Sequence, residues 1–187
     1  SRLQKDRPRL AVAHRNILST LSLIAFPVGM GLSLTSEETI IFLFGSKWKT
    51  SIEIFRWLAL SSMIQPIYNS HGWVYIAVGR TDALFRWGLL AVPCIVLCFV
   101  IGLSDGALGV ARAYSIGMFL LFVPGLAYVL RSAELPIRPA LRLFLRPLTA
   151  TLGMAAFVLS ASHLLSLQDI SLLARFGIKI GLGVGSY

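Results

Sequence analysis

The chain has 187 residues, of which 56% are apolar and only 13% charged. A water-soluble domain carries about 25% charged residues, so this composition excludes a soluble enzyme and a disordered chain and predicts a membrane protein. The formal net charge of +9 is spread over the segments between apolar stretches, which argues against a nucleic-acid-binding surface. Cys94 and Cys98 lie inside an apolar stretch, so neither a disulfide framework nor a zinc site is predicted.

Five segments of 18 to 23 residues contain no ionised side chain, and each is rich in Leu, Ile, Val, Phe and Ala. A transmembrane helix needs about 20 apolar residues, and no segment alternates as the strands of a β-barrel do. We therefore predict an all-α polytopic transmembrane helix bundle of about six spans, the last of them truncated. We expect a basic cytoplasmic connector over 1–15 and a bundle over 16–187, with spans near 16–35, 53–78, 85–104, 108–130, 146–166 and 170–187.

The basic residues predict the orientation of these spans. Eleven Lys and Arg side chains lie before the first span, between the second and third, or between the fourth and fifth, whereas the opposite loops contain only Lys47 and Lys49. The positive-inside rule therefore places the N-terminal segment in the cytoplasm. Because the chain begins without an initiator Met or a signal-peptide pattern and stops inside an apolar segment, we expect it to be a fragment of a longer protein.

Four consecutive spans carry a proline near the middle, namely Pro27, Pro66, Pro93 and Pro124. Proline removes an amide donor and kinks a helix, so four in register favour a bundle that bends around a lumen. The alternative is that proline is simply common in membrane helices. Between the first two spans, Ser36 is expected to begin a short surface-lying or re-entrant helix that ends at Gly45.

The second span is the least apolar. At 100° per residue, its polar and aromatic side chains fall on one face of the helix. These side chains are Glu53, Trp57, Tyr68, His71 and Tyr75, and Arg56 borders the face. This face is expected either to line a hydrophilic cavity or to pack against a neighbouring helix with its polar groups paired.

Basic side chains also enter the spans from the non-cytoplasmic side, and these are Arg56, Arg112, Arg175 and Lys179. An arginine at a helix centre costs about 2.5–3.5 kcal/mol on the insertion scale. Each of these side chains is able to snorkel to the interface, but together they would also make a lumen attractive to anions. The candidate lining residues are Arg56, Arg112, Tyr68 and His71. His14 and His163 each stand alone, so no catalytic residue, metal site or cofactor is predicted.

The order of several short motifs resembles a known family. Phe26-Pro27 is followed by Phe44-Gly45-Ser46-Lys47-Trp48, Gln65-Pro66, Val78-Gly79-Arg80 and the run from Gly106 to Ala111. Over about 17–145, the chain resembles the C-terminal half of the bacterial polysaccharide transporters, the O-antigen and exopolysaccharide flippases. These belong to the multidrug/oligosaccharidyl-lipid/polysaccharide superfamily.

The resemblance implies one of two pseudo-symmetric helical bundles in the bacterial cytoplasmic membrane. It also implies a protein that flips undecaprenyl-pyrophosphate-linked oligosaccharide between the leaflets. The partners would then be this lipid-linked substrate, membrane lipids and the N-terminal half of the same protein. Rocking of the two bundles, driven by an ion gradient, would alternate access to a cationic lumen. The alternatives are a small-molecule or drug exporter of the same superfamily, a membrane enzyme of polysaccharide assembly, and a structural membrane subunit.

Overall fold

The computed structural model describes residues 7–165 together with Gly177, Lys179, Gly181, Gly183 and Gly185. Within these residues every regular element is a helix, which confirms the expected all-α class. The α-helices are α1 (Arg7–Leu34), α2 (Ser36–Phe44), α3 (Ser51–Ser62), α4 (Gln65–Val78), α5 (Thr81–Gly102), α6 (Gly106–Ser132), α7 (Ile137–Leu143) and α8 (Leu145–Leu165). Two short 3-10 helices, η2 (Ser46–Trp48) and η3 (Leu103–Asp105), lie in the connections.

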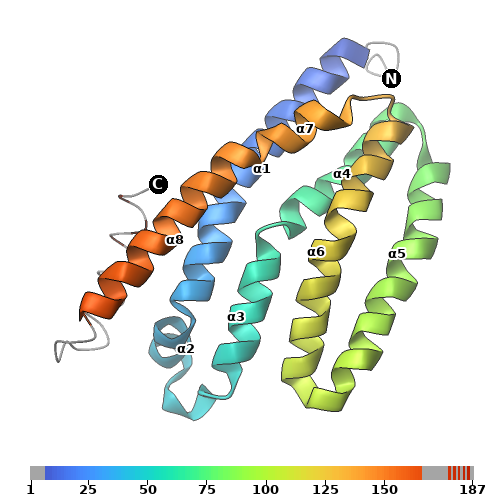
Figure 1. The fold of residues 1–187 in the computed structure, drawn as a ribbon. Helices are drawn as coiled ribbons and strands as arrows, with labels where there is room; N and C mark the ends of the chain where they lie inside the picture. The colour runs from blue at the N-terminus through green and yellow to red at the C-terminus, as the bar shows by residue number, and fades with distance from the viewer. Residues whose placement is uncertain are drawn as a thin grey trace.

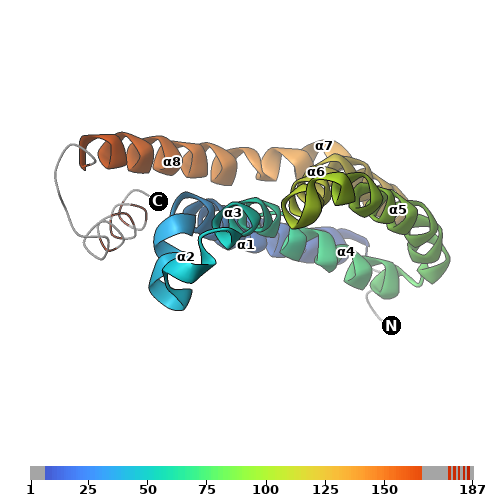
Figure 2. The same ribbon diagram turned by 90° about the horizontal axis from the view of Figure 1, so that it is seen from below.

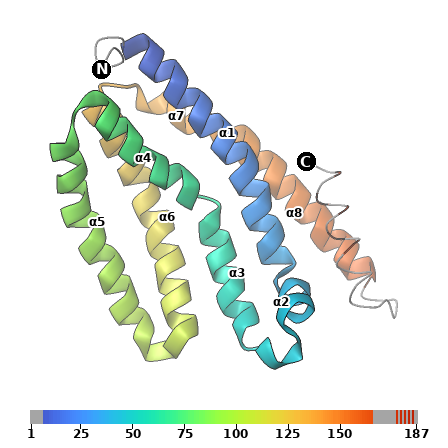
Figure 3. The ribbon, with the colours of Figure 1, turned by 180° about the vertical axis from the view of Figure 1, so that it is seen from behind.

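The helices pack in an order that runs across the molecule. α8 packs against α1, α1 against α3 and α4, these against α6, and α6 against α5 (Figure 1). Seen from below, α7 and α8 lie on one side of α1, α2 and α3 (Figure 2). The start of α1, the α4–α5 turn and the α6–α7 link share one end, which we call the basic end. α2, η2 and η3 lie at the other, which we call the α2 end (Figure 3).

Apolar side chains on the outside of the bundle identify a membrane protein. In the part of the chain that the structure describes, three helical stretches are long and apolar enough to cross a membrane, Arg9–Leu34, Thr81–Ser132 and Ile137–Ser160. The second of these contains both α5 and α6. The outermost helix, α5, exposes large side chains such as Phe85, Leu89 and Val100. A surface of this kind is stable against lipid and not against water. The expected number of six spans stays a prediction.

The predicted second span is divided into two helices. α3 ends at Ser62, where Met63 and Ile64 donate backbone hydrogen bonds to the third residue before them instead of the fourth. α4 then begins at Gln65, with Pro66 in its first turn, where an N–H would have no helical partner in any case. Met63 and Ile64 are buried in the core, so their apolar side chains hold the break inside the protein.

A tight hairpin joins α5 to α6. A side chain on Gly102 would place its Cβ 2.6 Å from the carbonyl oxygen of Gly109, and a side chain on Gly109 would collide with Gly102. Between them Gly106 has a φ of +65°, a conformation that favours glycine. The sequence places glycine at each of these positions, so the two helices approach backbone to backbone.

Several helix ends lie close to the expected ones. α5, α6 and α8 begin at 81, 106 and 145, within four residues of the predicted starts. α1 begins at Arg7 and so extends into the expected connector over 1–15. α7 carries Arg138 and Arg142 in a segment for which no helix was predicted. The predicted span near 170–187 lies outside the described residues apart from five helical positions.

Candidate functional site

Arg56 is held in place at the α2 end by two polar partners. Its Nη1 donates to Glu53 Oε1 at 2.5 Å, one turn earlier on α3, and its Nε donates to Ser36 Oγ at 3.1 Å, at the start of α2. The Arg56 side chain is still 41% exposed. A half-exposed ion pair contributes at most about 1 kcal/mol to stability, so its main effect is to fix the direction of the guanidinium group.

A second ion pair lies on the buried side of α2. Glu38 accepts a hydrogen bond from the Lys179 ammonium group, and both side chains are largely buried. The pair therefore joins α2 to a helical residue 141 positions later in the chain. Because Ser36 and Glu38 both belong to α2, this short helix anchors two basic side chains, one exposed and one buried.

Arg112 is exposed near the start of α6. Three residues later, Ser115 Oγ donates to the Trp57 carbonyl oxygen at 2.8 Å and ties α6 to α3. Trp57 directly follows Arg56, so the two arginines project from neighbouring helices close to one cross-link. Among the described residues, no carboxylate forms an ion pair with Arg112. Arg112 therefore adds a positive charge without a carboxylate partner close to the Arg56–Glu53 pair.

The aromatic residues of α4 form a cluster with α5 and α6. Trp87 Nε1 donates to the Tyr68 hydroxyl at 2.8 Å. The rings of Tyr68 and His71 lie 5.4 Å apart, those of Trp87 and Tyr128 5.6 Å, and those of Tyr75 and Tyr128 6.4 Å. These five side chains are the aromatic cluster. Aromatic pairs at such distances stabilise a fold by about 0.5–1.5 kcal/mol beyond burial.

The cluster depends on a glycine in α6. A side chain on Gly125 would place its Cβ 3.0 Å from the Trp87 ring and 3.1 Å from the Tyr68 ring. His71 and Tyr75 are buried, and within the described part of the chain His71 Nε2 and the Tyr75 hydroxyl have no hydrogen-bond partner. The cluster is thus tightly packed and retains two unused polar groups.

The structure separates the predicted site residues into two sets. Arg56 and Glu53 lie on α3 with Arg112 on the adjacent helix, whereas Tyr68 and His71 lie together in the aromatic cluster beyond the break at Met63. The structure shows no interaction between Arg56 and either Tyr68 or His71. Lining of a cavity by any of the four remains a prediction.

The sequence did not reveal two sets of partners. Trp87 and Tyr128 lie in other predicted spans, and only the packing of α4, α5 and α6 brings them to Tyr68. Glu38 lies in the short helix expected to begin at Ser36, but the sequence did not indicate Lys179 as its partner. Within residues 7–165 and the five later positions, no three His, Cys, Asp or Glu side chains come together as metal ligands.

These helices have the fold of a known class of transporter. The chain superimposes on the solved structure of the lipid II flippase MurJ in its inward closed conformation with a TM-score of 0.75, covering 99% of this chain and 39% of that one at 24% identity. The molecule is therefore a helical membrane protein with the fold of a flippase bundle.

Sequence relatives agree on a more specific assignment. A family model described as "Polysaccharide biosynthesis protein" matches residues 1–53. The teichuronic acid biosynthesis protein TuaB of Bacillus subtilis is 30% identical, over 91% of this chain and 35% of its own length. The lipopolysaccharide biosynthesis protein WzxC of Escherichia coli is 28% identical, over 61% of this chain and 23% of its own.

These matches confirm the resemblance to bacterial polysaccharide transporters seen in the motifs of the chain. The chain spans about a third of the length of TuaB and a smaller share of WzxC. The family model also covers residues 1–15, where the sequence indicated only a basic connector.

Proposed function

We propose that this chain forms part of a transporter that flips an undecaprenyl-pyrophosphate-linked oligosaccharide across the bacterial cytoplasmic membrane during polysaccharide biosynthesis. One observation carries the proposal. A chain related to polysaccharide and lipopolysaccharide biosynthesis proteins along most of its length has the fold of a lipid II flippase. This likeness favours a transporter over the alternative of a membrane enzyme.

The charged residues at the α2 end suit this substrate. A pyrophosphate group is a strong anion, and an arginine recognises phosphate through several parallel hydrogen bonds. Arg56 is oriented by Glu53 and Ser36 but keeps an exposed guanidinium surface, and Arg112 is exposed on the next helix. In the proposal these two arginines attract the pyrophosphate, and the remainder of the full-length protein supplies the other wall of the lumen. The two bundles would rock, driven by an ion gradient, to alternate access.

The test is complementation in cells that lack the gene for the full-length protein. We expect these cells to lose surface polysaccharide and to accumulate completed lipid-linked repeat units in the inner membrane, and the intact gene to restore export. If lipid-linked units never form, the protein acts earlier, as an enzyme of assembly. If the surface polysaccharide is unchanged, the proposal is wrong.

Three variants separate anion binding from scaffolding at Arg56. We expect Arg56→Ala to lower export at least tenfold at equal expression, and Arg56→Lys to retain an intermediate rate because it keeps the charge. Glu53→Ala is the matched control, since it removes the ion pair and leaves the guanidinium group. Equal losses from Arg56→Ala and Glu53→Ala would mean that Arg56 acts only by bracing α3.

A further inference from the structure

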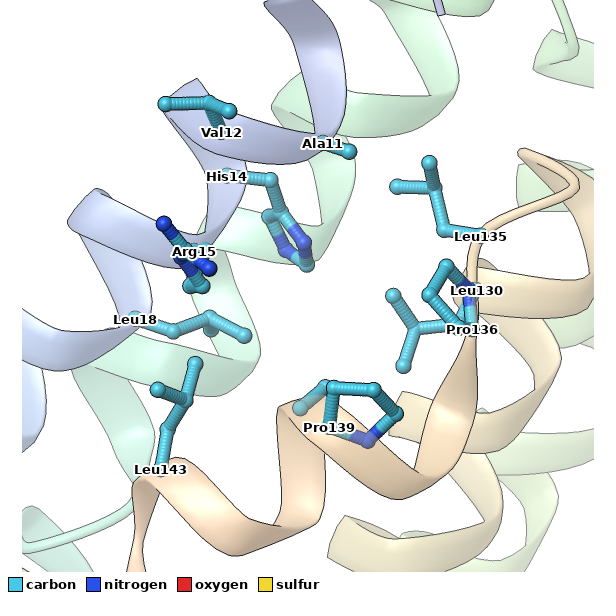
Figure 4. Close-up of a pocket in the computed structure, with 11 residues that line it drawn as sticks. Ala11, Val12, His14, Arg15, Leu18, Leu130, Leu135, Pro136, Pro139 and Leu143 are labelled. Carbon is cyan, nitrogen blue, oxygen red and sulfur yellow. The ribbon is translucent and has the colours of Figure 1, made fainter. Parts of the chain in front are cut away.

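A pocket of about 230 Å³ lies at the basic end, between the start of α1 and the segment that joins α6 to α7. Its walls are mostly apolar and include Leu18 of α1 together with Leu135, Pro139 and Leu143 (Figure 4). His14 and Arg15 are the polar members of the lining. The pocket is at the opposite end of the helices from Arg56 and Arg112 and is separate from the site described above.

His14 is a buried polar group directed into this pocket. Its side chain is only 4% exposed, and Figure 4 shows it projecting from α1 into the space bounded by Leu130, Leu135 and Pro139. Its Nε2 has no hydrogen-bond partner among the described residues. A buried polar group of this kind is usually satisfied by protein, water or a ligand, so His14 offers an unused hydrogen bond to a molecule in the pocket.

One arginine lines the pocket, and further arginines lie on the neighbouring helices α7 and α8. Arg15 belongs to the lining and is exposed, and exposed arginines follow along α7 and the start of α8, at Arg138, Arg142 and Arg146. Within the part of the chain that the structure describes, none of these four forms an ion pair with a carboxylate. Arg15 therefore supplies a positive charge at the pocket itself, and the other three add to the positive charge of the basic end.

The ligand must match both features, an apolar interior and the positive charge of Arg15. A free anion would leave the leucine and proline walls uncovered, and a hydrocarbon alone would leave His14 and Arg15 unpaired. An anionic phospholipid has both parts, and basic pockets between membrane helices on the cytoplasmic side are known to bind such headgroups. The positive charge of the loops places the basic end on that side.

We propose that this pocket binds an anionic phospholipid of the surrounding bilayer. The headgroup phosphate accepts hydrogen bonds from Arg15 and His14, and the upper part of an acyl chain lies against Leu18, Leu135 and Leu143. A bound lipid bridges α1 to α7 and so holds α7 and α8 against the rest of the bundle.

The test uses the purified full-length protein in nanodiscs of phosphatidylcholine with increasing phosphatidylglycerol. The readouts are the melting temperature and the number of lipids retained in native mass spectrometry. We expect phosphatidylglycerol to raise the melting temperature with saturation, and one molecule to remain bound. Arg15→Gln should weaken binding, so that the phosphatidylglycerol fraction needed for half-saturation rises at least fivefold. Arg86→Gln is the matched control, because it removes one exposed arginine from the same end on α5.

A second variant tests the interior of the pocket and distinguishes loss of lipid binding from loss of folding. Ala140 is a buried lining residue, so Ala140→Leu fills the space without changing charge. It should preserve the melting temperature in pure phosphatidylcholine and abolish the retained lipid. Equal effects of Arg15→Gln and Arg86→Gln would overturn the proposal in favour of general surface attraction. Full competition by glycerol phosphate would overturn it in favour of a free anion site, and equal binding of both lipids would show that charge plays no part.

Discussion

At the scale of single residues, several polar side chains of the bundle are paired with one another or with a backbone carbonyl group. Arg56 is paired with Glu53 and Ser36, Ser115 with the Trp57 carbonyl group, and Trp87 with Tyr68. Such hydrogen bonds contribute only about 0.5–1.5 kcal/mol each, but an unpaired partner in a buried place costs more. These pairs therefore specify which helix faces meet.

The hydrogen bond between Trp87 and Tyr68 gives a prediction on stability. Trp87→Phe keeps an aromatic ring against Tyr128 but removes the donor, so we expect a loss of about 1 kcal/mol. Trp73→Phe is the control, because Trp73 lies on α4, the helix that carries Tyr68, and its side chain is 69% exposed. This substitution should change the free energy of unfolding by less than about 0.5 kcal/mol. Thermal unfolding followed by circular dichroism measures both. Equal shifts would show that the hydrogen bond has no specific effect.

The ion pair between Glu38 and Lys179 gives a second prediction. Glu38→Gln leaves the lysine charge buried without its counter-ion, so we expect a loss of about 3 kcal/mol. The double variant Glu38→Gln/Lys179→Met should regain most of that loss, since it removes both charges. Glu37→Gln, at the exposed neighbouring position, should be close to neutral. Additive losses in the double variant would contradict a direct pair.

At the scale of helices, breaks and close approaches decide the packing. The interruption at Met63 and Ile64 lets α3 and α4 point their polar faces to different neighbours, whereas an uninterrupted helix would present one stripe. The α5–α6 hairpin depends instead on glycine, because Gly102 and Gly109 meet through their backbones.

The hairpin predicts opposite effects for two glycine substitutions. Gly109→Ala should destabilise the protein by about 1–3 kcal/mol, because its Cβ would collide with Gly102 and overpack the turn. Gly88→Ala, in α5, meets open space and should be neutral or stabilising by up to about 1 kcal/mol, since alanine favours a helix. Melting temperatures of the two variants in detergent test this. A stable Gly109→Ala protein would mean that the helices are able to separate there.

At the scale of the whole molecule, the two ends of the helices differ in charge and predict the orientation in the membrane. With Cys94 and Cys98 replaced by serine, Ser46→Cys reports on the α2 end and Thr81→Cys on the basic end, and both positions are exposed. We expect a membrane-impermeant maleimide to label Ser46→Cys in cells with a permeable outer membrane. Thr81→Cys should react only after the inner membrane is disrupted. The reverse pattern would contradict the positive-inside assignment.

The sequence alone determined the all-α membrane class and the resemblance to polysaccharide transporters. These properties depend on composition, on runs without charge and on the order of short motifs, which are all local in the chain. It also indicated a kink at Pro66, because a proline ring clashes with the turn before it, but not the division of the span into two helices.

Only the tertiary structure decided which polar groups meet. Lys179 reaches Glu38 from 141 residues away, Trp87 and Tyr128 join Tyr68 from other helices, and the pocket at His14 forms where α1 approaches α7. Such contacts depend on how helix faces pack, and helical periodicity reports only which side chains share a face. For the same reason the predicted stripe from Glu53 to Tyr75 was divided, because a break of two residues at Met63 and Ile64 gives each half its own neighbours.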